Sequence, residues 1–297
     1  MAVSEPYRFS FRAMGSPCSV HFYAESAQKA QHVAHHVIAH IESMEQNYSR
    51  YREGNLLSLI NEAARDGSAI KVNDEVLALL QYADVCYQQS GGLFDITAGV
   101  LREAWDFSNP EAVTLPSDDT LGELLTSVGW QHVEIDGDQL RFMRRNMALD
   151  FGGIVKEYAA DIAAAQLMAK GVASGLVELG GDIRAIGPHP DGRPWTVKVR
   201  DPHKPGQHAA QLELTSEGLA TSGDYERYVM IEGQRYSHLL SPRTGWPVQG
   251  LASVTVKAPQ CVVAGSAATI AMLMEDAGES WLKSLGVEYL AIAPESV

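Results

Sequence analysis

Several short segments of the chain place glycines beside a carboxylate, a hydroxyl or a cation. The clearest are 91–95 (GGLFD), 150–156 (DFGGIVK) and 178–182 (ELGGD). Two further segments, 220–225 (ATSGDY) and 237–245 (SHLLSPRTG), add hydroxyls, a histidine and an arginine. Because glycine lets a backbone approach a ligand closely, all five segments are candidates for the wall of a ligand site.

The segment 150–156 has the features of an anion site. A predicted strand (MALDF) runs into Gly152-Gly153, and a predicted helix begins directly after them. Free N–H groups at the start of a helix suit a phosphate, and Lys156 in the first turn would add a positive charge. The segment matches neither GxxxxGK[ST] nor GxGxxG. Ordinary turn chemistry also explains the two glycines, so both interpretations stay open here.

Two single residues are candidates for further chemistry. His238 lies beside a predicted strand end and a Pro-led turn that contains Arg243, a setting that favours an acid–base or ligand role. Thr269, on a predicted helix rich in small residues, could give an oxygen ligand to a hard cation. By contrast, His32, His36 and His40 share one helix face without a carboxylate motif, which favours an exposed polar face.

Composition narrows the class of partner. The 297 residues carry a formal net charge of −14, a field that repels nucleic acids and anionic lipids but leaves room for a local basic pocket. The sequence has no apolar run long enough to cross a membrane and no signal-peptide pattern at its start. The three cysteines show neither a disulfide framework nor a metal pattern, so we expect small buried side chains and a cytoplasmic location.

The hydrophobic pattern predicts an α+β protein with helices packed on antiparallel sheets. Helices are expected at 26–47, 74–90, 155–171 and 262–274, and a long loop at 106–120. After residue 172 the sequence pattern changes to short apolar runs, many of them separated by Gly, Pro, Asp or Asn, and this pattern is typical of antiparallel strands. These runs are 175–179, 183–187, 195–200, 210–215, 228–231 and 252–257.

The ordered set of motifs resembles the ApbE family, the FAD:protein FMN transferases. The resemblance covers roughly residues 11–274. It is carried by MGS at 14–16, YSRY with a later Asn61, GGLFDIT at 91–97, DFGGIVKEYAAD at 150–161, LVELGGD at 176–182, LATSGDYERY at 219–228, SHLLSPRTGWPV at 237–248 and SVTVKAP at 253–259. Each motif is weak alone, and their order and spacing give the resemblance its strength.

The resemblance implies an enzyme that cuts the pyrophosphate of FAD and passes FMN to a Thr or Ser hydroxyl of an acceptor protein, with AMP released. A divalent cation, usually Mg²⁺, would polarise the pyrophosphate. It also implies an ApbE-like, T-fold-related architecture over a single unit, 1–297. The FAD cleft would lie between an N-terminal part (about 1–150) and a sheet-rich C-terminal part (about 151–297).

The resemblance also assigns roles to individual residues of this sequence. His238 would act on the reacting phosphates as the catalytic residue. FAD would be bound by Met14, Tyr51, Leu93, Phe94, Asp95, Asp150, Lys156 and His238. The metal would be held by the backbone carbonyl of Gly153 and by Thr269.

The chain departs from the family pattern at the predicted metal site. The family segment A-D-A-x-x-T reads AGSAAT here, so Gly265 stands where the family has its metal-binding Asp. Ser241 replaces a second Asp in the H-I-I-D-P turn. Asp182 or a partner could supply the missing carboxylate. The alternative to an active transferase is therefore a metal-impaired or non-catalytic FAD-binding protein, with residual FAD pyrophosphatase activity as a variant. Greatly raised Mg²⁺-dependent activity in Gly265→Asp would show that the natural protein is a weakened enzyme, and no effect would show that the metal role given to this segment is wrong.

Overall fold

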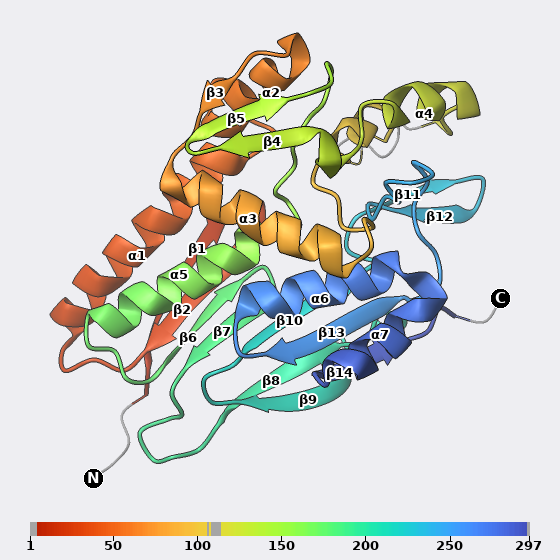
Figure 1. The fold of residues 1–297 in the computed structure, drawn as a ribbon. Coiled ribbons are helices and arrows are strands. Elements are labelled where there is room, and N and C mark those ends of the chain that lie inside the picture. Colours follow the sequence, from red (N-terminus) through yellow and green to blue (C-terminus); the bar gives the residue numbers. More distant parts are fainter. Residues whose placement is uncertain (1–4, 106, 108–113, 296–297) are drawn as a thin grey trace.

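The fold is built on a seven-stranded antiparallel sheet, seen in a computed structural model that describes residues 5–105, 107 and 114–295 (Figure 1). The strand order is β1-β2-β6-β7-β10-β13-β14, and every neighbouring pair is antiparallel. The bounds of these strands are β1 Tyr7–Ala13, β2 Ser16–Phe22, β6 Gly175–Leu179, β7 Asp182–Ile186, β10 Gly218–Gly223, β13 Ser253–Ala258 and β14 Glu288–Ile292.

Helices cover one face of this sheet (Figure 1). α5 packs on β6 and β7, α6 packs on β10 and β13, and α1 contacts α5 and β1. α3 lies on α6, where the Tyr82 hydroxyl is 2.7 Å from Ser266 Oγ. The helices are α1 Ala27–Tyr48, α2 Leu56–Asp66, α3 Asp74–Gln89, α4 Asp118–Leu125, α5 Val155–Ala169, α6 Cys261–Leu273 and α7 Gly278–Leu285.

Smaller strand pairs complete the fold. The hairpin of β8 (Trp195–Arg200) and β9 (His208–Leu214) covers part of the other sheet face, where Trp195 and Leu214 pack on Leu176 and Ile183. A three-stranded sheet of β3 (Ile70–Lys71), β5 (Gln139–Phe142) and β4 (Val133–Asp136) lies near α2 (Figure 1). A separate ribbon joins β11 (Tyr228–Ile231) to β12 (Gln234–Ser237). No helix in the part of the chain described here has both the length and the apolar character to cross a membrane.

The sequence predicts most of these elements. The expected helices at 26–47, 74–90, 155–171 and 262–274 correspond to α1, α3, α5 and α6, and the α+β class is confirmed. The predicted loop 106–120 is too long at its C-terminal end, because Ser117 caps a helix that begins at Asp118. Residues 106 and 108–113 of that loop lie outside the described part.

The central strand β10 is the main element that the apolar pattern of the sequence did not predict. Its sequence, GLATSG, has no alternating large apolar residues, yet it pairs with β7 and β13 in the middle of the sheet. The reason is close packing: a Cβ on Gly218 would lie 2.3 Å from the backbone nitrogen of Cys261 at the start of α6. Small residues are therefore required where α6 meets the sheet.

Asp161 fixes the start of α6 against α5. Its Oδ1 accepts a hydrogen bond from the backbone nitrogen of Cys261 and its Oδ2 accepts one from that of Val262, both at 2.9 Å. Arg184 Nε, from β7, lies 3.0 Å from Asp161 Oδ1. A carboxylate at a helix N-terminus satisfies free N–H groups and is favoured by the helix dipole. One side chain thus links two helices and the sheet.

We expect Asp161→Ala to lower the free energy of unfolding by about 3 kcal/mol, because two N–H groups lose their acceptor and the half-buried guanidinium of Arg184 loses its counter-charge. Urea denaturation at pH 7 measures this change. Asp119→Ala, at an exposed position of α4, is the control and should change stability by less than about 0.5 kcal/mol. An equally small effect of Asp161→Ala would show that this carboxylate does not link the elements.

Candidate active site

One cavity, of about 980 Å³, gathers the predicted site residues. It is lined from both halves of the chain, between Met14 and Arg102 and between Asp150 and Leu273. All ten predicted site residues contribute to its wall: Met14, Tyr51, Leu93, Phe94, Asp95, Asp150, Gly153, Lys156, His238 and Thr269. Their individual roles toward a ligand stay predictions, but their convergence is a property of the fold.

The tight turn between β1 and β2 carries Met14 to the cavity. The turn has two residues, Met14 and Gly15, with φ values of 53° and 72°. Positive φ at both positions matches the twist of a β-hairpin but is uncommon for a residue other than Gly, Asn or Asp. Met14 therefore occupies a backbone conformation that disfavours its own side chain.

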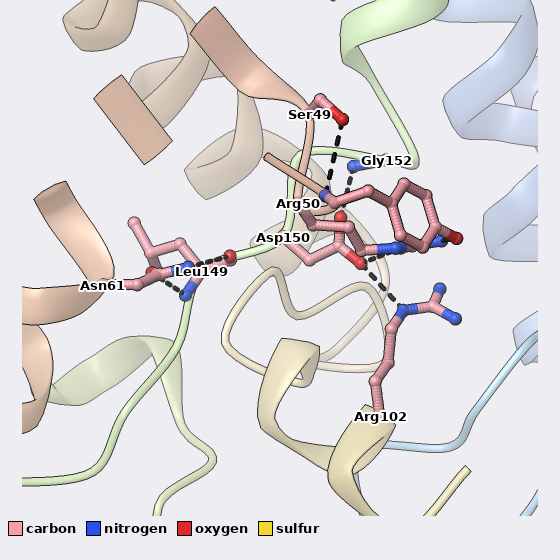
Figure 2. A network of polar contacts seen from close by, with 8 residues as sticks. Ser49, Arg50, Asn61, Arg102, Leu149, Asp150 and Gly152 are labelled. Atoms are coloured by element: carbon pink, nitrogen blue, oxygen red, sulfur yellow. Dashed lines mark hydrogen bonds and ion pairs between the residues drawn. The ribbon is translucent and has the colours of Figure 1, made fainter. Parts of the chain in front are cut away.

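Asp150 is the centre of a polar network at the cavity wall (Figure 2). Its Oδ2 accepts hydrogen bonds from Arg50 Nη1 and, at 2.9 Å, from Arg102 Nε. Its Oδ1 accepts one from the backbone nitrogen of Gly152 at 2.8 Å. The two guanidinium groups hold the pKa of Asp150 well below its usual range despite burial. The predicted FAD-contacting carboxylate is thus engaged by the chain itself, and it holds two arginines at the cavity.

Neighbouring contacts fix this network in place. Asn61 on α2 makes two hydrogen bonds to the backbone of Leu149, one from its Nδ2 to the carbonyl (3.1 Å) and one from the Leu149 nitrogen to its Oδ1 (2.8 Å) (Figure 2). Arg50 also stacks on Tyr51, with Cζ 4.9 Å from the ring centroid. The Tyr51 side chain lines the cavity although the residue is 65% exposed. An exposed aromatic ring with one face on a cation is well suited to stack on a planar ligand.

Side chains at positions 152 and 153 would be crowded by their neighbours. A Cβ on Gly152 would lie 2.9 Å from Asp150 Oδ1, and one on Gly153 would lie 3.1 Å from Phe94 Cζ. Phe94 is buried, and its neighbour Asp95 shapes the same loop. The Asp95 carboxylate accepts hydrogen bonds from Thr97 and from the backbone nitrogen of Trp130. Packing thus disfavours a side chain at either glycine, and the approach of a ligand to their backbone stays a prediction.

The cavity wall differs in charge from the rest of the protein. Six cationic residues line it: Arg50, Arg52, Arg102, Lys156, Arg200 and Arg227. Six acidic residues line it as well: Glu45, Asp95, Asp150, Glu157, Glu178 and Glu226. The wall is therefore formally neutral in a chain of net charge −14. Sequence reasoning named only Lys156 among the cations; Arg50 lies within the YSRY motif, which could have indicated it.

His238 is held as a neutral imidazole beside these cations. Its Nδ1 lies 3.1 Å from the carbonyl oxygen of Arg227. A carbonyl only accepts, so Nδ1 carries the proton and Nε2 keeps a lone pair. Burial, together with the charges of Arg102 and Arg227, lowers the pKa of His238 to about 3. A histidine in this state is unprotonated at neutral pH, with the Nε2 lone pair free.

The start of α5 brings a cation and two carboxylates together. Lys156 Nζ lies 2.6 Å from Asp182 Oδ2, so the predicted phosphate-facing ammonium is ion-paired. Glu157, which sequence reasoning missed, is 7% exposed, and burial with the nearby charge of Asp182 raises its pKa. The sequence could have indicated its burial, because Glu157 shares the helical spacing of Ala160 and Ala164, which lie on the buried helix face. Across the described residues, no group of three or more His, Cys, Asp or Glu side chains could by itself hold a metal ion.

Comparison with known proteins places this sequence and its α+β fold in one class. The profile described as "ApbE family" matches residues 14–291. A Rhodobacter capsulatus protein named FAD:protein FMN transferase is 35% identical over 78% of this chain and 44% of its own length. A Chlamydia pneumoniae protein of the same name is 32% identical over 79% of this chain and 73% of its own length.

Solved structures agree with these relatives. The Thermotoga maritima ApbE protein has a TM-score of 0.89 at 29% identity, covering 97% of this chain and 94% of that one. The Pseudomonas stutzeri flavinyl transferase ApbE, in its apo form, has a TM-score of 0.88 at 29% identity, covering 100% and 94%. The chain belongs to the ApbE family. It spans less than half the length of the Rhodobacter relative but nearly the whole of these structures.

We expect Asp150→Asn to lower the free energy of unfolding at pH 7 by about 3 kcal/mol, because two half-buried guanidinium groups lose their counter-charge. Since the folded pKa lies below the unfolded one, this stabilisation is present above about pH 4 and is lost as the pH falls through the folded pKa. Denaturant titrations of both proteins at pH 7 and pH 3 measure the difference.

The matched control is Asp138→Asn, which removes an exposed ion pair with Lys71 and should change stability by less than about 1 kcal/mol. If the effect of Asp150→Asn is as small as that of the control, or does not shrink at acid pH, the paired arginines do not depend on this carboxylate.

Proposed function

We propose that this protein is an FAD:protein FMN transferase, which takes FMN from FAD, attaches it to a Thr or Ser hydroxyl of an acceptor protein and releases AMP. The observation that supports this best is the cavity in which all ten motif residues meet a wall containing six cations. The names of the relatives support the same activity.

The cavity wall has both aromatic and thioether side chains and cationic hydrogen-bond donors, which suit a ligand with planar rings and a pyrophosphate. Met14 and the exposed ring of Tyr51 line the cavity and would contact the flavin and adenine portions. Arg50 and Arg102, held by Asp150, offer donors for phosphate oxygens. Lys156 is the predicted phosphate neighbour, although its pairing with Asp182 weakens the charge that it presents. Leu93, Phe94 and Asp95 would complete the FAD site.

The proposed reaction is a phosphoryl-type displacement. The acceptor hydroxyl oxygen forms a bond to the phosphorus on the riboflavin side, and the bond from that phosphorus to the bridging oxygen breaks. AMP leaves with the bridging oxygen. The hydroxyl proton goes to Nε2 of His238, the imidazole nitrogen that the Arg227 carbonyl leaves unprotonated. The positively charged imidazole that results would be stabilised by the negative charge of the departing phosphate.

The residues present fit a divalent cation at one end of this wall. The Thr269 hydroxyl, 2.7 Å from Ser222 Oγ, and the backbone of Gly153 both line the cavity. The buried Glu157 Oε2 on the same wall has no hydrogen-bond partner in the described part of the chain. Bound there, Mg²⁺ would neutralise charge on the pyrophosphate. The alternative function, an FAD-binding protein impaired in metal binding, is favoured by Gly265 and Ser241, which stand where the family pattern has Asp.

The proposed partners are FAD and an acceptor protein with a Thr or Ser site, and no nucleic acid. The proposed domain arrangement is one unit with its FAD cleft between the parts before and after about residue 150. A cytoplasmic location also stays a proposal; the three cysteines are buried free thiols, which are compatible with a reducing compartment.

Incubation with FAD, Mg²⁺ and a peptide bearing a family-type acceptor Thr tests the proposed function. We expect intact-mass analysis to show a gain on the peptide equal to an FMN moiety, with equimolar AMP, and neither product when EDTA removes the metal. Bound FAD with no mass gain and no AMP would instead establish the flavin-binding alternative.

We expect His238→Gln to lower kcat for FMN transfer at least 100-fold while FAD affinity changes less than threefold, because a general base supplies about 10²–10⁴-fold. His208→Gln, exposed on β9, is the control. Because the pKa of His238 lies near 3, the base form persists on acidification, and kcat/KM of the native protein should not fall at pH 6.5 on its account. Full activity of His238→Gln would remove His238 from the mechanism.

A further inference from the structure

Glu157 occupies the space that a side chain at position 265 would need. A Cβ built on Gly265 of α6 would lie 2.5 Å from Glu157 Cγ and 2.9 Å from both Cδ and Oε1. Real Cβ atoms do not approach carbon atoms this closely, so the two positions cannot both carry a side chain in this arrangement. Gly265 is therefore the residue that lets a carboxylate from α5 lie against α6.

This carboxylate belongs to a buried residue of the cavity wall and has one oxygen without a hydrogen-bond partner in the described part of the chain. The residue is 7% exposed, and the oxygen is Oε2. A buried carboxylate oxygen without a donor is costly unless a ligand or ion satisfies it. The site thus lacks a positive group next to Oε2.

Asp182, a second carboxylate nearby, is ion-paired. Its Oδ2 is paired with Lys156 Nζ at 2.6 Å, and its Oδ1 accepts a hydrogen bond from the backbone nitrogen of Thr221 at 3.3 Å. Glu157 and Glu226 also lie near the Lys156 ammonium, so one ammonium faces three carboxylates. Of the three, Glu157 is the one that lies against Gly265 on α6.

We propose that Glu157 is the carboxylate ligand of the divalent cation in this protein, reaching across from α5 to the place beside Gly265. The proposal rests on the proposed function for the identity of the ion and its phosphate co-ligands. Thr269 lies one helical turn after Gly265 on α6, so its hydroxyl is on the same helix face as the Glu157 carboxylate. Mg²⁺ commonly binds one or two carboxylates together with substrate phosphates, and this wall can supply that set.

Binding of Mn²⁺, followed by electron paramagnetic resonance, tests the assignment without any turnover. The native protein with FAD and no acceptor should bind one tight Mn²⁺. Glu157→Gln keeps the volume of the side chain and removes its charge, and we expect it to weaken Mn²⁺ binding at least tenfold. Glu45→Gln, which changes another carboxylate of the cavity wall on α1, should leave Mn²⁺ affinity within threefold.

A carboxylate exchange gives the sharper comparison. Gly265→Asp alone should bind Mn²⁺ no better than the native protein, because its Cβ forces Glu157 out of position. The double variant Glu157→Gly with Gly265→Asp should restore Mn²⁺ affinity to within threefold of the native value. If Glu157→Gln fails to fold, the double variant still decides the question.

Unchanged Mn²⁺ affinity in folded Glu157→Gln, or no Mn²⁺ binding by the native protein with FAD, overturns the assignment. A folded double variant that does not bind Mn²⁺ also counts against it. The proposed function can fail separately. If the native protein binds Mn²⁺ through Glu157 but transfers no FMN, Glu157 remains the metal ligand and the transferase function is rejected. If the protein transfers FMN but its Mn²⁺ affinity does not depend on Glu157, the transferase function remains and Glu157 is rejected as the ligand.

Discussion

The close packing of α5 and α6 on the centre of the sheet is the constraint on which the rest of the structure depends. The buried positions of both helices are dominated by small residues, among them Ala160 and Ala164 on α5 and Ala264 and Ala268 on α6. Small side chains let helix and strand backbones approach closely, and Gly218 shows how little room remains. Because the site residues lie at the ends of these elements, a shift of either helix would move the Gly-Gly turn, Glu157 and Thr269 relative to one another.

Electrostatics at the site are local rather than global. A chain with a net charge of −14 repels a doubly negative pyrophosphate at long range, and within about 8 Å at physiological salt the nearest charges dominate. The arginines around Asp150 and the neutral His238 form such a short-range environment. Selectivity for an anionic ligand then comes from hydrogen-bond donors that are fixed in place before the ligand binds. Long-range electrostatic steering should raise the association rate constant only weakly.

Sequence patterns predicted the amphipathic elements well and the small-residue elements poorly. α1 and α3 have a clear apolar face, and Ser26 and Asn73 cap them as helix starts usually are. β10 has no such face, because its neighbours leave no volume for large side chains. Motif resemblance located the cavity residues, since motifs record types and spacing.

Motifs do not indicate which residues a side chain pairs with or packs against in the folded protein. That is why the pairing of Asp150 with two arginines, and the placement of Glu157 against Gly265, appear only in three dimensions. Within its own segment, Gly265 indicates only that an acidic side chain is missing. The facing helix α5 places the carboxylate of Glu157 in the space beside Gly265. These residues are 108 positions apart, so neither segment alone indicates their contact.

The tip of the β1–β2 hairpin has a consequence for how this protein would respond to selection. Met14 holds a positive φ that costs a residue of its kind about 1 kcal/mol, and Asn or Gly would relieve it. Selection for thermal stability alone would therefore remove the thioether from the cavity, and melting curves would record only an improvement. The strained residue persists only where something other than stability is being selected, so its retention among variants would report on use of the cavity.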